Sequence, residues 1–159
     1  MTVSKRLAEL GITLPAALSA LGSYVPAMRT GNLIFTSGQL PLTDGRITVT
    51  GRVGAELDVG AARQAARTSV IAALGAAATL ADLDLVTRVV KVTVYVAATP
   101  GFTEQPTVAN GASELLTDVF GAPGQHARSA VGVASLPLGA PVEVELVLEL
   151  AENPPATRR

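Results

Sequence analysis

Two charged residues in the last third of the sequence could bind and hydrolyse a small ligand. Arg128 lies in the segment HARSAVGVASL, and Glu143 lies in PVEVELVLEL. A guanidinium among small residues can hold a carboxylate through two parallel hydrogen bonds. A glutamate in a poorly solvated site can accept a proton or orient a water molecule. Arg128 could instead form an ion pair with Glu143 or Glu145 at a subunit interface, so residue type alone leaves both interpretations open.

Three further polar residues are candidates for ligand binding. Tyr24, in GSYVPA, could donate a hydrogen bond to a ligand, although buried tyrosines often bond the protein itself. Ser37, in TSGQ, lacks the GxSxG pattern of a nucleophile elbow. Asn110 interrupts an apolar helix pattern and could equally serve helix packing. His126, the single histidine, is expected in a loop at the edge of the site rather than as a general base.

The composition excludes several classes of function. The 159 residues include no cysteine and one histidine, which excludes disulfides, thiolate nucleophiles and zinc sites built on several of these residues. Basic and acidic residues number 12 and 13, and aromatic residues make up 3%, so no nucleic-acid surface is expected. The N-terminal residues contain no apolar signal segment, and no stretch is apolar enough for a membrane span. The sequence predicts a cytoplasmic protein.

The apolar pattern predicts the elements that position these residues. Asp58 is a helix N-cap before an alanine-rich helix over residues 59–80, whose small residues share one face. A second helix is predicted over 104–120 from apolar residues at helical spacing. Strands are predicted at 31–40, 46–53, 88–98, 127–136 and 141–150, with the first two paired as a hairpin. This pattern is typical of an α+β domain with two helices on one face of a mostly antiparallel sheet.

The same pattern divides the chain into three parts. Residues 1–21, interrupted by Gly11 and Pro15, are interpreted as an N-terminal extension on the surface of the domain. Residues 22–150 form the folded domain, and residues 151–159 are expected to be a disordered tail.

Alternation along the strands predicts which side chains share a face of the sheet. In the last strand, Val142 begins the apolar face, which turns Glu143 to the other side. In the strand before it, Ser129, Val131 and Val133 are expected in the core, so that Arg128 and Ala130 lie on the same face as Glu143. The residues expected to be buried in the strand at 88–98 are Val90, Val92, Val94 and Val96. The second face is too apolar for water, which predicts that another subunit covers it.

Taken together, the segments resemble the RidA (YjgF) family of enamine and imine deaminases. The resemblance spans residues 22–150 and is carried by GSYVPAMRTGNLIFTSGQLPL, VVKVTVYVA, FTEQPTVANGASELL and HARSAVGVASLPLGAPVEVELVLEL. It implies a chorismate-mutase-like fold and a homotrimer with clefts between subunits. The implied reaction is hydrolysis of a 2-imino or 2-enamino acid to a 2-keto acid and ammonia, without metal or cofactor.

The resemblance also implies roles for individual residues. Arg128 would hold the carboxylate of a small metabolite, and Glu143 would position the attacking water. Tyr24, Ser37 and Asn110 match positions that bind substrate in the family.

Several features depart from the family pattern. The Ser-Gln pair of the family's GPYSQA segment is Val25-Pro26 here, and Ala130, a predicted substrate-binding position, stands where the family often has cysteine. With the N-terminal extension, these features indicate a longer subgroup. The alternative function is a binding protein that captures a carboxylate on Arg128 without turnover. Endoribonuclease activity, a label that some relatives carry, is disfavoured by the acidic isoelectric point and the few aromatic residues.

Overall fold

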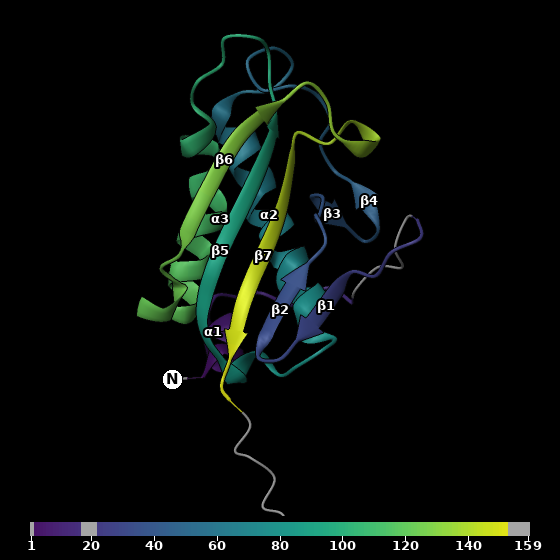
Figure 1. The fold of residues 1–159 in the computed structure, drawn as a ribbon. Helices are drawn as coiled ribbons and strands as arrows, with labels where there is room; N and C mark the ends of the chain where they lie inside the picture. The colour runs from purple at the N-terminus through teal and green to yellow at the C-terminus, as the bar shows by residue number, and fades with distance from the viewer. Residues whose placement is uncertain (1, 17–21, 153–159) are drawn as a thin grey trace, which may run out of the picture.

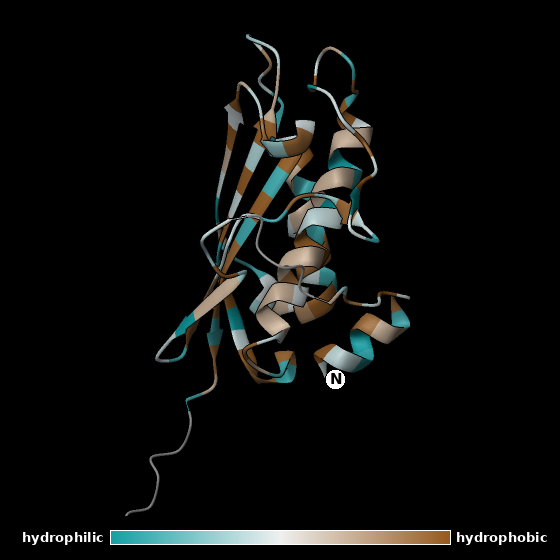
Figure 2. Cartoon of the chain, turned by 90° about the vertical axis from the view of Figure 1, so that its right-hand side faces the viewer, coloured by the Kyte–Doolittle hydropathy of each residue, from teal (hydrophilic) through white to brown (hydrophobic). Residues whose placement is uncertain are grey.

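Five strands form one sheet, and the two long helices lie against a single face of it (Figures 1 and 2). The computed structural model describes residues 2–16 and 22–152. In chain order the elements are α1 (Val3–Glu9), β1 (Ala27–Thr30), β2 (Leu33–Thr36), β3 (Leu42–Thr43), β4 (Arg46–Ile47), α2 (Val59–Ala78), β5 (Val86–Ala97), α3 (Gln105–Phe120), β6 (Ala127–Val133) and β7 (Val142–Leu150). None of the described helices is both long and apolar enough to span a membrane.

The strand order is β1-β2-β7-β5-β6, and β3 pairs with β4 in a separate small ribbon. Every pairing in the main sheet is antiparallel except that of β5 with β6, which α3 connects. A parallel pair requires such a crossover, whereas antiparallel neighbours can be joined by a short turn. The predicted α+β class, with two long helices on one face of a mostly antiparallel sheet, is confirmed.

Small side chains allow α2 to lie close to the sheet and to α3. Asp58 caps the helix by accepting a hydrogen bond from the main-chain nitrogen of Ala61 at 2.7 Å. The predicted inner stripe is buried throughout: Ala62, Ala65, Ala66, Ser69, Ala73 and Ala77. The two helices approach each other closely at Gly111 of α3, where a Cβ atom would collide with the main-chain oxygen of Arg63. The spacing of α2 and α3 therefore depends on a glycine at residue 111.

The predicted hairpin between residues 31–40 and 46–53 is wrong. Residues 31–40 contain the turn that joins β1 to β2, and Gly31 occupies its positive-φ position at 57°. The later turn consists of Asp44 and Gly45, with φ of 50° and 75°. A two-residue turn of this kind pairs the residues that directly flank it, so the hairpin that forms is β3 with β4.

The prediction for the buried face of β5 is wrong at one residue. Val89 is buried and Val90 is exposed, whereas Val92, Val94 and Val96 are buried as expected. The register of β5 against β7 shifts between Val89 and Lys91, which is the mark of a β-bulge. Simple alternation cannot detect the extra residue.

The described part of the N-terminal extension packs on the helical layer. α1 buries Val3 and Leu7, and the Arg6 Nε atom donates to the main-chain oxygen of Asp118 at 2.8 Å. Met1, residues 17–21 and residues 153–159 lie outside the described residues, so most of the predicted disordered tail stays a prediction.

Replacing Gly111 by alanine should destabilise the fold, although alanine favours helix formation. The added methyl group would meet the main chain of Arg63, which cannot move aside as a side chain could. Overpacking of this kind costs about 1–3 kcal/mol. Urea denaturation should show a lower midpoint and an unchanged slope.

Gly60→Ala is the matched control for this substitution. The nearest atom to its new Cβ would be a carboxylate oxygen of the Asp58 side chain at 3.3 Å, which can shift more easily than main chain, so the midpoint should fall much less than in Gly111→Ala. An unchanged midpoint for Gly111→Ala would contradict a steric limit between the two helices.

Candidate active site

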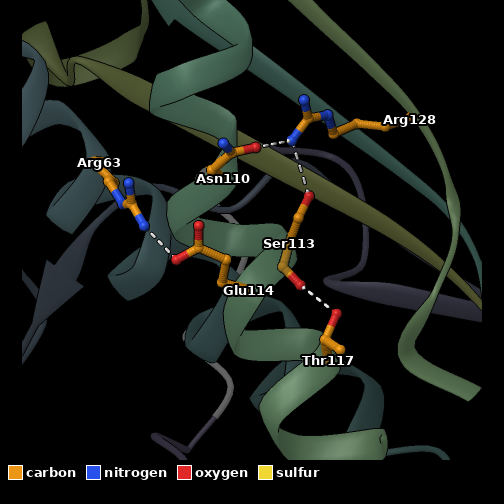
Figure 3. A network of polar contacts seen from close by, with 6 residues as sticks. All are labelled: Arg63, Asn110, Ser113, Glu114, Thr117 and Arg128. Atoms are coloured by element: carbon orange, nitrogen blue, oxygen red, sulfur yellow. Dashed lines mark hydrogen bonds and ion pairs between the residues drawn. The ribbon is translucent and has the colours of Figure 1, made fainter. Parts of the chain in front are cut away.

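Arg128 lies near the start of β6 and is held by two residues of α3 (Figure 3). Its Nη1 atom donates to the Oδ1 atom of Asn110 at 2.8 Å and to the Oγ atom of Ser113 at 3.1 Å. In the parallel register Arg128 stands beside Val92, whose side chain is fully buried under the helices. The side chain of Arg128 is therefore on the helix-covered side of the sheet.

The prediction that Arg128 and Ala130 share the face of Glu143 is wrong. Ala130 is partly buried against the hydrophobic core. Ser129 accepts a hydrogen bond from the Nζ atom of Lys91 at 3.0 Å on the open face, and Val131 is 43% exposed there. The segment ARSAVGV offers small apolar residues to both faces, and β6 is an edge strand, so alternation had no strong signal to follow.

The contacts of Arg128 leave one edge of its guanidinium available. Nη1 carries two hydrogens, and Asn110 and Ser113 accept both. The remaining donors, on Nε and Nη2, lie side by side and match the two oxygens of a carboxylate. Among the described residues no carboxylate forms an ion pair with Arg128. The alternative ion pair with Glu143 or Glu145 is thus not formed within one chain.

Ser113 connects Arg128 to the single histidine. The Ser113 Oγ atom lies 2.9 Å from Nε2 of His126, and Nδ1 of the ring lies 2.6 Å from the main-chain oxygen of Gly124. A carbonyl can only accept, so Nδ1 carries a hydrogen, and in the neutral ring Nε2 accepts from the Ser113 hydroxyl. Burial lowers the pKa of His126; the hydrogen bond to Gly124 opposes this, and the charge of Arg128 lowers the pKa further.

The sequence reasoning missed Ser113. A signal was present, because Ser113 follows Asn110 by three residues and therefore lies on the same face of a helix. His126 lies between η2 (Ala122–Gly124) and β6, at the edge of the site as predicted.

Glu143 lies half-buried on the open face of the sheet. Burial raises the pKa of its carboxyl, and the neighbouring charge of Glu145 adds to the rise. The Tyr95 hydroxyl donates a hydrogen bond to Glu145, which raises the pKa of Tyr95 to about 12. A Cβ atom at Gly38 would overlap the Glu143 carboxylate, so with any other residue at this position the Glu143 side chain would have to move.

Ser37 and Tyr24 belong to the same region as Glu143. The Ser37 Oγ atom donates to the main-chain oxygen of Val25 at 2.6 Å, and its main-chain nitrogen donates to Pro26 at 2.9 Å. These bonds join the segment before Gly38 to the altered segment GSYVPA. The Tyr24 side chain is 52% exposed.

The predicted site residues therefore form two separate groups in one chain. Asn110, Arg128 and Ala130 lie on the helix-covered side at the β6 edge, and Glu143 lies on the open face, next to the segment that contains Ser37. In the strand register Arg128 stands level with Val92, and Glu143 stands level with Tyr95. Val92 and Tyr95 are three residues apart on β5, which corresponds to about 10 Å along the strand. Arg128 and Glu143 are separated by this distance and also lie on opposite faces of the sheet.

Comparison with known proteins identifies the family. Residues 14–150 match the family model described as Endoribonuclease L-PSP. The chain belongs to the RidA (YjgF) family. Among RidA-family structures, the YjgF gene product of E. coli is 29% identical, with 86% of this chain and 93% of that chain covered and a TM-score of 0.60.

Two other solved structures are similar to this chain. The Agrobacterium tumefaciens protein Atu1372 is 46% identical, with 94% of each chain covered and a TM-score of 0.85. E. coli TdcF, solved with bound serine, is 26% identical, with 87% of this chain and 96% of that chain covered and a TM-score of 0.62. The higher score and coverage of Atu1372 agree with a longer subgroup within the RidA family.

Arg128→Ala should raise the pKa of His126. The substitution removes the positive charge that disfavours protonation of the ring, while burial still keeps the pKa below its usual value. Because the chain has one histidine, its imidazole resonances in a proton NMR titration need no assignment by mutation.

Arg88→Ala is the control, since Arg88 pairs with Glu149 at 3.0 Å elsewhere on the sheet. It should leave the titration of His126 unchanged. Identical titration curves for the wild type and Arg128→Ala would show that the two side chains do not interact.

Proposed function

We propose that this RidA-family protein hydrolyses small 2-imino or 2-enamino acids to 2-keto acids and ammonia. The observation that carries the proposal is the guanidinium of Arg128, which two neutral acceptors hold and no described carboxylate neutralises. Such a group favours a carboxylate ligand. The structure of TdcF with bound serine supports the same ligand class, because serine carries a carboxylate and an amino nitrogen on adjacent atoms.

Glu143 is proposed to act on the water. In imine hydrolysis, water adds to the carbon of the C=N bond, the nitrogen gains protons, and ammonia leaves as the carbonyl forms. A carboxylate whose pKa is raised by burial is a stronger base when ionised and can take the proton from the attacking water. Its carboxylate lies directly against the main chain at Gly38.

The complete site is proposed to lie between two copies of the chain in a homotrimer. Arg128 and Glu143 lie on opposite faces of one sheet, so one protomer cannot bring both to a small substrate, whereas a second copy can supply the missing group. The uncovered face also carries apolar side chains; Phe35 is 42% and Val131 is 43% exposed. An interface would remove these side chains from water.

A binding function without turnover is the second candidate. The Arg128 anchor is complete within one chain, whereas the proposed catalytic carboxylate is not, so binding requires less of the assembly than hydrolysis does. An amino-acid oxidase that generates a panel of imino acids separates the candidates. Faster loss of imine in the presence of the protein indicates an enzyme, and an unchanged rate with measurable 2-keto acid binding indicates a binding protein.

Arg128→Ala should abolish turnover and weaken 2-keto acid binding by roughly 30- to 5,000-fold, corresponding to about 2–5 kcal/mol for a sheltered charge pair. Arg128→Lys should recover little, because an ammonium cannot reproduce the two-pronged contact. Isothermal titration and the oxidase-coupled assay measure the two effects. Full activity in a correctly folded Arg128→Ala protein would exclude Arg128 as the anchor.

Glu143→Gln should lower turnover by about 100-fold or more while leaving binding within a few-fold. A base must be ionised, so the wild-type rate should fall as the pH drops through the raised pKa of Glu143, and the variant should lack this dependence. Glu145→Gln is the control: it should keep turnover near the wild-type rate, but the loss of rate should move to lower pH, because the charge of Glu145 contributes to the raised pKa of Glu143.

Mixing the two inactive variants tests the intersubunit site. When equal amounts of Arg128→Ala and Glu143→Gln chains are mixed at random in trimers, about one quarter of the interfaces combine an intact Arg128 with an intact Glu143. Turnover should therefore return to about one quarter of the wild-type rate. Mixed trimers that stay inactive would contradict a site shared in this way.

A further inference from the structure

We infer that Ser113 and His126 are positioning residues for Arg128, which hold its guanidinium so that the Nε and Nη2 edge is presented to a ligand carboxylate. This inference rests on the proposed function, because it assigns Arg128 the role of carboxylate anchor. Neither residue contacts the ligand in this arrangement. They act through the orientation of the Arg128 side chain.

The direction of every hydrogen bond in the chain from Gly124 to Arg128 follows from one fixed acceptor. The Gly124 carbonyl requires a hydrogen on Nδ1 of His126, at 2.6 Å. In the neutral ring Nε2 is then an acceptor and receives the Ser113 hydroxyl hydrogen, at 2.9 Å. With its hydrogen turned to His126, the Ser113 oxygen offers its lone pairs to Nη1 of Arg128, at 3.1 Å.

His126 matters because a serine hydroxyl can otherwise rotate. Within a helix, an unrestrained serine commonly donates to the main-chain oxygen one turn earlier. Thr117 shows this alternative one turn further along α3, where its hydroxyl donates to the main-chain oxygen of Ser113 at 3.0 Å (Figure 3). The ring of His126 keeps the Ser113 hydroxyl out of that arrangement.

Two acceptors fix the plane of the guanidinium where one would not. Asn110 and Ser113 both accept from Nη1, and both are half-buried on α3. A single hydrogen bond would allow the group to turn about that bond. Two bonds to one nitrogen define the orientation of the opposite edge, and the loss of rotational freedom occurs before the ligand arrives.

The test measures binding of pyruvate, a small 2-keto acid, and of its uncharged amide. Ser113→Ala should weaken pyruvate binding by about 10- to 100-fold, the usual scale for a hydrogen bond to a charged group, and should leave the weak binding of pyruvamide unchanged. Ser113→Thr keeps the hydroxyl and should bind pyruvate nearly as the wild type does. Thr117→Ala is the matched control on the same helix and should also bind normally.

His126 is tested by rescue. His126→Leu removes the acceptor for the Ser113 hydroxyl and should weaken pyruvate binding, whereas His126→Gln offers a side-chain carbonyl in its place and should recover most of the affinity. In the wild type, nitrogen-15 NMR of the single histidine should show the hydrogen on Nδ1. Thermal unfolding of each variant controls for loss of structure.

The outcomes separate this inference from the proposed function. If Arg128→Ala abolishes pyruvate binding and Ser113→Ala does not weaken it, Arg128 is the carboxylate anchor but Ser113 does not position it. Equal loss of pyruvate and pyruvamide binding in Ser113→Ala would mean a general structural defect and would also overturn it. If the wild type binds pyruvate no better than pyruvamide, Arg128 is not a carboxylate anchor, and the positioning role of Ser113 and His126 is wrong as well.

Discussion

The close approach of α3 to α2 is the constraint on which the Arg128 site depends. At Gly111 the chain of α3 lies directly against the main chain of Arg63, and neither partner can yield. On the exposed side of the same contact, Arg63 forms an ion pair with Glu114. An exposed pair contributes about 0–1 kcal/mol, less than the roughly 1–3 kcal/mol of a steric misfit. The steric contact at Gly111 therefore sets the position of α3, and the position of α3 in turn places Asn110 and Ser113 beside Arg128.

The one-sided arrangement of the helices gives the two faces of the sheet different electrostatic characters. The covered side holds the positive charge of Arg128, which no described carboxylate neutralises in one chain. The open side holds Glu143 and Glu145, whose proximity contributes to the raised pKa of Glu143. Lys91 also lies on the open side, where its Nζ atom donates to Ser129, so that side carries charges of both signs.

Strong local signals made much of the fold predictable from sequence. The Asp58 cap and the alanine stripe located α2, and the alternation from Val142 to Leu150 located both faces of β7 correctly. Residue type and the family resemblance together supplied the candidate site residues, but the grouping of Arg128 with Glu143 failed because small residues on both sides of β6 hide its orientation. The bulge at Val90 and the contact between Ser113 and His126 depend on pairing across the chain. Such features have no signature within a single segment.

The place of β7 in the sheet has a consequence for how the chain is made. β7 is hydrogen-bonded to β2 on one side and to β5 on the other, and its Glu149 pairs with Leu33. It is also the last of the five strands of this sheet in chain order. Until residues 142–150 emerge, the hairpin of β1 and β2 has no sheet to join, and the apolar undersides of α2 and β5 stay exposed to water. Contacts between residues so distant in sequence form slowly, so the sheet of this domain can close only after residues 142–150 have been made.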